Sequence, residues 1–487
     1  REIHEVAGLR HSAKQVLNVP TCNPPPYMDQ ALRYADAHYD TFTTELEQLL
    51  RIPSISTDSQ YADEVQRAAD WLVDHLTSIG TQHAEAISTG GHPIVYAEHH
   101  TGDDKPTVLV YGHYDVQPPD PLDEWNSDPF EPTRQNGTLY ARGACDDKGQ
   151  MFMHLKALES YLAAGEAPPV NLKFIIEGEE ETGSVHLAPF IANHTSQLEA
   201  DVVLISDTAM FAPGVPSITY GLRGLAYAEV TLQGPSRDLH SGIYGGGVEN
   251  PINALADLLS QLHDDDHRIT IPGFYDDARD LTEAERQTYA ELPFDEARWT
   301  DEIGVPETKS EAGYTTVECI SARPTLDVNG IWGGYTGEGA KTVLPAKAHA
   351  KISTRLVPDQ RPDDIYDTLE AHLNALCPDT MTLTFRRLHG GKPVLVDTES
   401  AAMQAAKDAM EAVIGTEPFF VRNGGSIPVV ADFKDYLGLD SVLMGFGLDS
   451  DAIHSPNEHF GLDRFEKGIK AIIRFHARYA EGRVDES

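Results

Sequence analysis

The chain has 487 residues, of which 40% are hydrophobic, and its formal net charge is −40. At roughly 150 residues per domain this length suggests several domains, and the composition excludes collagens, coiled coils and disordered tails. The charge argues against a nucleic-acid partner, because phosphates require Lys and Arg, and against an anionic membrane surface. No apolar run approaches the roughly 18 residues that cross a membrane.

The basic residues are few, and only 14 of the 37 are lysines. An acidic, lysine-poor surface suits a protein in concentrated salt, where screening weakens the repulsion between like charges. We therefore hold a halophilic source as a hypothesis. The alternative is an acidic surface that serves solubility alone. An unfolding series in KCl separates the two, because full stability in dilute buffer counts against the first.

The four cysteines are widely spaced and include no C-x-x-C pair, so they indicate neither a disulfide scaffold nor a cysteine zinc site. Residues 1–27 contain no apolar segment of the secretory type. The cysteine pattern favours the reducing cytoplasm. We treat residues 1–27 as an extension of unknown role, with a genuine helical arm as the alternative.

The first regular elements are predicted between residues 31 and 80. Apolar residues recur there at helical spacing, and Gly80 is a plausible helix end. Apolar runs without alternation follow at 107–111, 172–176, 202–205 and 441–444. Such runs are typical of strands buried on both faces, and the helical stretch 151–162 lies between two of them. The order predicts an α/β fold with a mostly parallel central sheet flanked by helices.

The pattern of apolar and polar residues changes near residue 222. Alternating runs that indicate half-exposed strands occur at 226–232, 348–356 and 381–387. Helical patterns occupy 251–262 and 362–376, and a polar, acidic stretch that we read as irregular spans 263–322. These pieces predict an inserted α+β domain at 222–388. The α/β domain would then consist of two parts, 28–221 and 389–487.

Polar residues with metal-binding chemistry follow the predicted strands. Because open α/β sheets place their sites at the carboxyl ends of the strands, these residues are expected to converge. Two histidines with several carboxylates suit Zn²⁺, Mn²⁺ or Co²⁺. They outnumber the ligands of one tetrahedral ion, which indicates a two-metal site with a bridging carboxylate. The candidates are His113, Asp115, Asp146, the glutamates of 177–181, Asp207 and His454.

Each candidate alone has an ordinary explanation. His113 or His454 is more often a satisfied polar residue than a ligand, Asp146 suits a helix N-cap, Asp207 suits a turn, and a run of glutamates is usually a solvated loop. Their joint occurrence at strand ends favours the metal site.

Eight motifs resemble one known family. They are YGHYDVQP (111–118), RGACDDKG (142–149), EGEEETGS (177–184), ISD (205–207), RDLHSG (237–242), RLVP (355–358), GGSIP (424–428) and HSPNE (454–458). The chain resembles the co-catalytic metallopeptidases that include carnosinases, cytosolic nonspecific dipeptidases, acetylornithine deacetylase, succinyl-diaminopimelate desuccinylase and carboxypeptidase G. The resemblance covers roughly residues 28–480 and is strongest for the carnosinase-like dipeptidase branch.

The resemblance implies a zinc-peptidase-like catalytic domain with two divalent ions per subunit, zinc first and Mn²⁺ or Co²⁺ as alternatives. One ion would be held by His113, Asp146 and Asp207, and the other by Asp146, Glu181 and His454. The peptide bond between Asp146 and Asp147 would be cis.

The resemblance also assigns the groups around the metals. Glu180 would be the general base, and Asp115 would orient the imidazole of His113. Three consecutive glutamates leave a one-residue ambiguity. The spacing to Thr-Gly-Ser favours Glu180 as the base, and Glu179 is the alternative.

The inserted domain would be a lid and dimerisation domain. By resemblance, His240 would stabilise the oxyanion in the site of the partner subunit, with help from Thr342, and Arg355 and Ser426 would bind the substrate terminus. From the residues alone the ordinary explanations are stronger, namely a surface position in a glycine-rich loop for His240 and a strand-face ion pair for Arg355.

The implied function is hydrolysis of the amide bond of dipeptides, with no role for nucleic acid or membrane. The main alternative is an acyl-amino-acid deacylase or carboxypeptidase of the same fold. The long insertion at 263–322 favours the dipeptidase branch. A binding protein without activity is a third hypothesis, and the presence of every implied ligand and of Glu180 argues against it.

Overall fold

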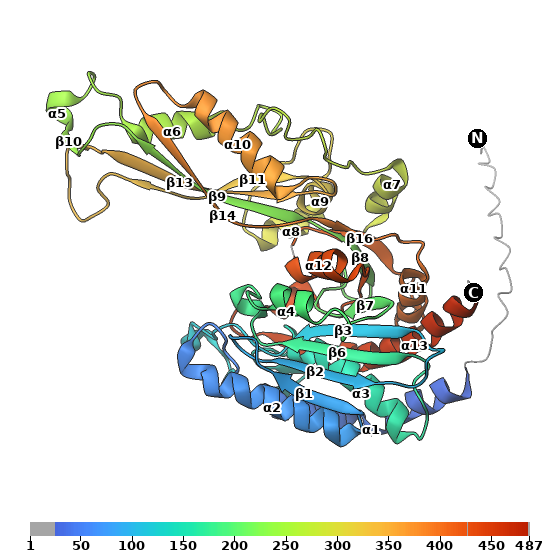
Figure 1. The fold of residues 1–487 in the computed structure, drawn as a ribbon. Coiled ribbons are helices and arrows are strands. Elements are labelled where there is room, and N and C mark those ends of the chain that lie inside the picture. Colours follow the sequence, from blue (N-terminus) through green and yellow to red (C-terminus); the bar gives the residue numbers. More distant parts are fainter. Residues whose placement is uncertain (1–24, 426, 486–487) are drawn as a thin grey trace, which may run out of the picture.

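The structure is a computed structural model that describes residues 25–425 and 427–485. Residues 1–24, which include Cys22, and Ser426 lie outside these ranges, so the predictions made for them are not addressed by the structure. Two sheet-centred parts lie one above the other in Figure 1. The larger is built on a nine-stranded sheet and the smaller on a four-stranded sheet. No helix among the described residues has the length and apolarity to cross a membrane.

The larger sheet has a parallel centre, because β3 pairs in parallel with β6 and β7, and β7 with β17. β1, β2 and β15 pair antiparallel at the edges, and β16 joins β8 in parallel. The strand order is β1 (His83–Ile87), β2 (Ile94–His99), β6 (Asn171–Glu177), β3 (Thr107–His113), β7 (Val202–Ile205), β17 (Ser441–Leu443), β8 (Ser217–Leu222) and β15 (Val394–Leu395), with β16 (Phe419–Asn423) beside β8. The four strands predicted from apolar runs are all present and neighbour one another.

Helices cover both faces of this sheet, which explains the unalternating runs. Successive residues of β3 point to opposite faces, so Val108 and Val110 belong to one core and Leu109 and Tyr111 to the other. The first core includes residues of α1 (Pro26–Leu50), α2 (Ala62–Ile79), α3 (Lys148–Ala163), α11 (Ala401–Ile414) and α13 (Leu462–Asp485). The second includes residues of α4 (Leu187–Asn193) and α12 (Pro428–Asp432).

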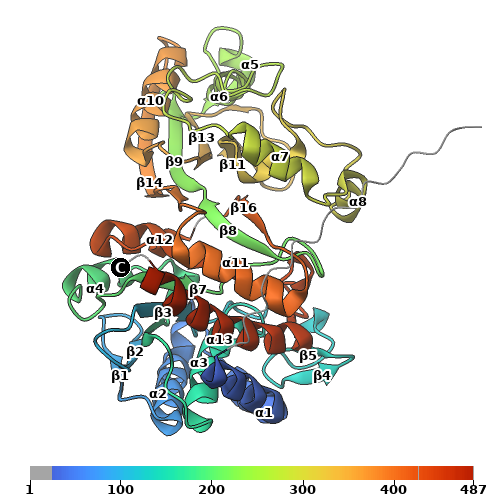
Figure 2. The same ribbon diagram turned by 90° about the vertical axis from the view of Figure 1, so that its right-hand side faces the viewer.

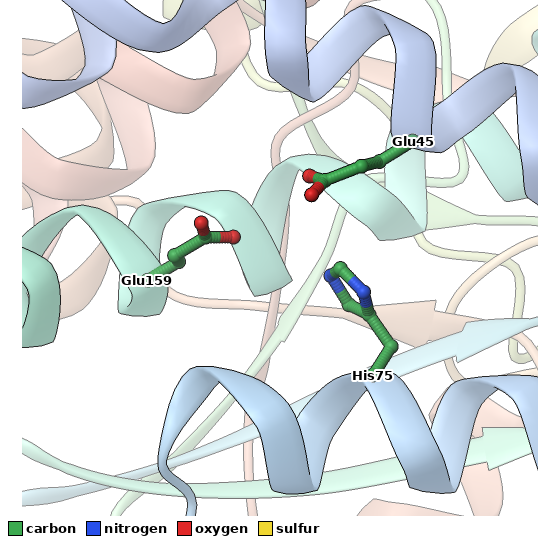
Figure 3. Close-up of side chains that lie close together, drawn as sticks. All are labelled: Glu45, His75 and Glu159. Carbon is green, nitrogen blue, oxygen red and sulfur yellow. The ribbon is translucent and has the colours of Figure 1, made fainter.

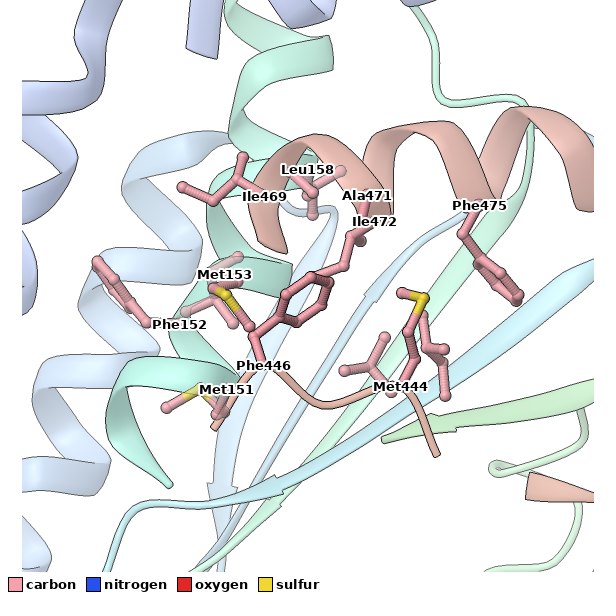
Figure 4. Packing of buried hydrophobic residues seen from close by; sticks show 14 of the residues in the cluster. Met151, Phe152, Met153, Leu158, Met444, Phe446, Ile469, Ala471, Ile472 and Phe475 are labelled. Atoms are coloured by element: carbon pink, nitrogen blue, oxygen red, sulfur yellow. The ribbon is translucent and has the colours of Figure 1, made fainter. Parts of the chain in front are cut away.

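Helix α3 lies within the first core. This helix is buried along almost its whole length, and Met151, Phe152 and Met153 lie among side chains of α13 and of the segment after β17 (Figure 4). Each fully buried side chain of this size contributes about 1.5–3 kcal/mol by leaving water. The core therefore holds α3, and the loop that precedes it, against the carboxyl ends of the strands.

The smaller part is an antiparallel sheet with helices. Its strand order is β11 (Thr325–Gly333), β13 (Lys347–Leu356), β9 (Gly224–Gln233) and β14 (Thr382–Gly391), and α6 (Pro251–Ser260) and α10 (Pro362–Leu376) contribute to its core. β8 and β9 are separated by one residue, and β14 and β15 by two. The chain thus passes between the sheets near residues 223 and 392. The division into domains at 222 and 388 stays a prediction.

The stretch 263–322 differs from its prediction, because it contains helices. They are α7 (Glu283–Glu291), α8 (Glu296–Glu302) and α9 (Thr316–Ser321). The first and third begin at capping boxes, in which Thr282 pairs with Glu285 and Thr315 with Glu318. A Thr-x-x-Glu pattern satisfies two backbone donors at a helix start. The acidic composition that suggested irregular structure thus includes residues that begin helices.

His476, on α13, makes stability depend on pH. It is buried, both ring nitrogens lack hydrogen-bond partners, and burial lowers its pKa to about 3. Between pH 3 and 6.5 the unfolded chain therefore binds a proton that the folded chain does not, so stability falls as the pH drops through this window. At about 1.4 kcal/mol per pKa unit, His476 costs about 3 kcal/mol at pH 4.

We expect His476→Leu to reduce the loss of unfolding free energy between pH 7 and pH 4 in metal-free protein. Urea unfolding at both pH values measures it. The exposed His100, on the surface loop beside Asp103, provides the control variant His100→Gln. Equal pH dependence of His476→Leu and the unchanged chain would show that His476 is not the source.

Candidate metal centre

The predicted ligands gather at the carboxyl ends of the central strands. His113 is the last residue of β3, Asp207 lies two residues after β7, and the glutamate run begins at the end of β6. His454 lies on the loop after β17, and Asp146 lies two residues before α3. Because β6, β3, β7 and β17 are neighbours in one parallel array, these five segments meet at one edge.

Asp146 stands between the two histidines. Its Oδ1 is 3.1 Å from Nε2 of His113, and its Oδ2 is 2.9 Å from Nε2 of His454. Asp207 Oδ2 is 3.9 Å from the first histidine, and Glu181 Oε2 is 3.3 Å from the second. Two groups with metal-ligand spacing result, and they share Asp146. These are the two ligand sets that the resemblance implied.

The loop before α3 aims the Asp146 carboxylate. The peptide bond between Asp146 and Asp147 is cis, as predicted. The buried Glu458 accepts hydrogen bonds from the amides of Gly143, Cys145 and Asp146, at 2.9, 3.0 and 3.1 Å. Glu458 ends the motif at 454–458, in which the sequence alone predicts a role for His454 only.

Asp115 is fully buried and contacts both His113 and the glutamate turn. Nδ1 of His113 lies 3.1 Å from the Asp115 carbonyl oxygen and 3.4 Å from its carboxylate. That carboxylate accepts hydrogen bonds from the amides of Glu180 and Glu181 and from the hydroxyl of Ser56. The carbonyl is the closer partner of the imidazole. The carboxylate holds the turn that carries the next two glutamates.

The three glutamates point to different partners. Glu179 accepts a hydrogen bond from the His92 amide at 3.1 Å, and its other oxygen lies 2.7 Å from Nδ1 of His186. Glu181 contacts His454 and accepts a hydrogen bond from Gln117 at 2.7 Å. Because Glu179 is already engaged away from the ligands, the geometry favours Glu180 as the free carboxylate beside them.

The buried carboxylates of the two ligand sets lie close together, and their mutual repulsion changes the pKa values of the centre. Burial and neighbouring carboxylates raise the pKa of Glu180 to about 8 and that of Asp207 to about 7. Hydrogen bonds to Asp146 and Glu181 raise the pKa of His454 to about 10. Divalent cations would supply the missing positive charge and lower all three pKa values. The nitrogen and oxygen donors therefore fit two such ions chemically.

A third acidic group lies outside this centre. Glu45, His75 and Glu159 point toward one another from α1, α2 and α3 (Figure 3). The buried ammonium of Lys156 contacts all three, with Nζ 2.5 Å from Glu45, 2.6 Å from Glu159 and 2.8 Å from Nε2 of His75. Since a lysine already supplies the positive charge here, we assign no metal to this group.

Three of the residues predicted to bind substrate or its oxyanion, His240, Thr342 and Arg355, lie on the smaller part. His240 and Thr342 are both exposed and adjacent, because β10 (Leu239–His240) pairs with β12 (Val343–Leu344) and the Ser241 amide donates to the Thr342 carbonyl. The neighbouring α5 (Ser241–Tyr244) lies at the far end of this part, away from the nine-stranded sheet (Figures 1 and 2). Arg355 is half-buried near the end of β13.

Comparison with known proteins identifies the family. A model of peptidase family M20/M25/M40 matches residues 109–478. The chain belongs to this family. The Cys-Gly metallodipeptidase dug1 of Schizosaccharomyces pombe is 35% identical over 92% of this chain and 97% of the relative. The Beta-Ala-His dipeptidase of Homo sapiens is 31% identical over 94% of each. A solved M20 family metallo-carboxypeptidase, Sso-CP2 from Sulfolobus solfataricus, is 35% identical over 90% of this chain and 99% of that one, with a TM-score of 0.80.

Membership of family M20 confirms the resemblance drawn from the eight motifs, the α/β fold and the prediction of a metal-dependent hydrolase. The described cysteines Cys145, Cys319 and Cys377 are free. The residue roles, the identity of the metals and the dimer stay predictions.

Proposed function

We propose that this M20 peptidase hydrolyses dipeptides at a centre of two divalent ions. The observation that carries the proposal is the position of Asp146, whose two oxygens face two separate ligand sets. A carboxylate shared in this way is the arrangement that a two-metal hydrolase requires. His113 and Asp207 complete one set, and Glu181 and His454 complete the other.

Each residue has a distinct task in the reaction. When bound, the two ions polarise the scissile carbonyl and lower the pKa of a water molecule. Glu180 accepts the proton of that water and delivers it to the leaving amine. Asp115 keeps the His113 imidazole in place and holds the amides of Glu180 and Glu181, so that base and ligand keep a constant spacing.

Substrate binding is assigned to four residues, three of which lie on the smaller part. Arg355 pairs with the substrate carboxylate through its planar guanidinium, and Ser426 contacts the same terminus. His240, with Thr342, stabilises the oxyanion in the site of a second copy of the chain. The exposure of His240 and its place at the end of the smaller part support action across a dimer rather than within one chain.

Exposed apolar residues on and beside the edge strand β11 support the homodimer. Val328, Ile331, Trp332 and, just beyond the strand, Tyr335 are each at least 41% exposed. β11 is also the edge of the four-stranded sheet, so its backbone can pair with another strand. Apolar residues on an unpaired edge favour a partner of the same kind.

Hybrid dimers test the trans role of His240. Removing an oxyanion donor should lower kcat by about 10²–10³-fold, so His240→Ala and Glu180→Gln should each be inactive or nearly so. We expect an equimolar mixture to regain activity, because one site of each hybrid has an intact base and an intact histidine. A mixture that exchanges subunits, shown by mass-tagged chains, and stays inactive would place His240 in its own site or make the chain a monomer.

A substrate panel decides between dipeptidase and the alternatives. We expect dipeptides to be cleaved in preference to acetylated amino acids and longer peptides, and chelation to abolish the activity until Zn²⁺ or Mn²⁺ is restored. The similarity to a metallo-carboxypeptidase keeps carboxypeptidase activity as the second candidate. Preferential cleavage of acetylated amino acids, or of the last residue of longer peptides, would overturn the first choice.

We also infer zinc as the metal, a cytoplasmic location and a need for salt. The histidine and carboxylate donors support zinc, with Mn²⁺ and Co²⁺ as alternatives. The free cysteines support a reducing compartment. The net charge of −40 supports a salt requirement, which the KCl unfolding series measures.

A further inference from the structure

Glu458 is a buried carboxylate that the reaction itself does not use. Its side chain is inaccessible to solvent and accepts four hydrogen bonds. Three donors are the amides of Gly143, Cys145 and Asp146, and the fourth is Nη1 of Arg142, at 2.8 Å. Every partner is a donor, so both oxygens of this side chain act as acceptors in the four contacts.

The four contacts fix the loop that carries the bridging ligand. One Glu458 oxygen contacts Cys145 and Asp146, and the other contacts Gly143 and Arg142. The loop of residues 142–146 thus surrounds a single carboxylate. It is followed by the cis peptide bond between Asp146 and Asp147 and then by α3. The direction of the Asp146 side chain is set by this backbone.

Glu458 also belongs to the segment that carries the opposite histidine. It lies four residues after His454, and its backbone carbonyl accepts a hydrogen bond from the Ala141 amide at 3.1 Å. The same residue therefore joins the loop of the bridging carboxylate to the loop of a terminal ligand. If the hydrogen bonds of Glu458 to residues 141–146 are lost, we expect Asp146 and His454 to lose their 2.9 Å contact.

We propose that Glu458 is a positioning residue for the metal centre, which orients Asp146 through the backbone of residues 143–146. This inference rests on the proposed two-metal function. Partners that orient metal ligands typically contribute about 10–100-fold to metal affinity or activity.

Asp451 provides a matched control. It is also buried and makes a two-pronged ion pair with an arginine, Arg464. It contacts the Cys145 side chain, at 3.3 Å, and the Leu448 amide. None of its hydrogen bonds goes to the backbone of residues 143–146. Loss of Asp451 should therefore weaken the fold without releasing the bridging ligand.

The test compares Glu458→Gln with Asp451→Asn. The Gln amide would turn an N–H group toward an N–H donor of the loop. We expect both variants to lower the unfolding midpoint of metal-free protein, and only Glu458→Gln to lower Zn²⁺ affinity, by about 10–100-fold in chelator competition. The visible spectrum of the Co²⁺-loaded protein should change in the same variant alone.

Three results would overturn the inference. Glu458→Gln could bind Zn²⁺ as tightly as the unchanged chain, or Asp451→Asn could lose as much affinity. If Glu458→Gln does not fold, Glu458→Asp replaces it in the test. The shorter side chain keeps the carboxylate but cannot reach all four donors. Normal Zn²⁺ affinity of Glu458→Asp would likewise overturn the inference. An unchanged chain that binds no Zn²⁺ would instead refute the two-metal function itself.

Discussion

Glu180→Gln should lower kcat by about 10²–10⁴-fold, which is the usual contribution of a general base. The amide keeps the size of the side chain but cannot accept the proton of the attacking water. Because Glu180 belongs to neither group of ligand atoms, both ions should still bind. The measurements are kcat on a dipeptide and the number of Zn²⁺ ions per chain.

Glu179→Gln is the matched control, since it makes the same chemical change one residue away. Glu179 holds the His92 amide and lies against His186, so its loss should affect stability by about 0.5–1.5 kcal/mol and activity only slightly. An inactive Glu179→Gln together with an active Glu180→Gln would show that the register of the glutamates is shifted by one.

The sequence predicts those features of the fold that depend on residues close together in the chain. The strands at 107–111 and 202–205 could be predicted because a sheet covered on both faces requires unbroken apolar runs. Their ends then located His113 and Asp207, since parallel strands share one carboxyl edge. Gly80 ends α2 in the left-handed conformation, as a glycine at this position allows.

Other features depend on contacts between distant parts of the chain. Glu458 and Asp146 are 312 residues apart in sequence, and no periodicity relates them. Whether Glu179 or Glu180 faces the ligands depends on His92 and His186, which approach Glu179 only in the folded chain. The helices of 263–322 are different, because the Thr282–Glu285 capping box is a local signal that the sequence itself contains.

Asp146→Asn should have a larger effect on the metals than the loss of any terminal ligand. Its carboxylate faces both ligand sets, and a neutral amide supports two cations poorly. We expect the chain to hold at most one tightly bound Zn²⁺ and its activity to fall by about 10³-fold or more, because ion-based charge stabilisation is worth several kcal/mol. Metal analysis after gel filtration and dipeptide hydrolysis measure both effects.

The comparison variant is His454→Ala, which removes a ligand from one set only. This change should leave the set of His113, Asp146 and Asp207 complete, so one Zn²⁺ should remain bound and the second should be recovered at high Zn²⁺ concentration. Asp146→Asn should not recover in this way, since excess metal cannot replace the shared carboxylate. If both variants retained two ions with normal affinity, Asp146 would not be the bridge, and the two groups would have to be independent single-metal sites.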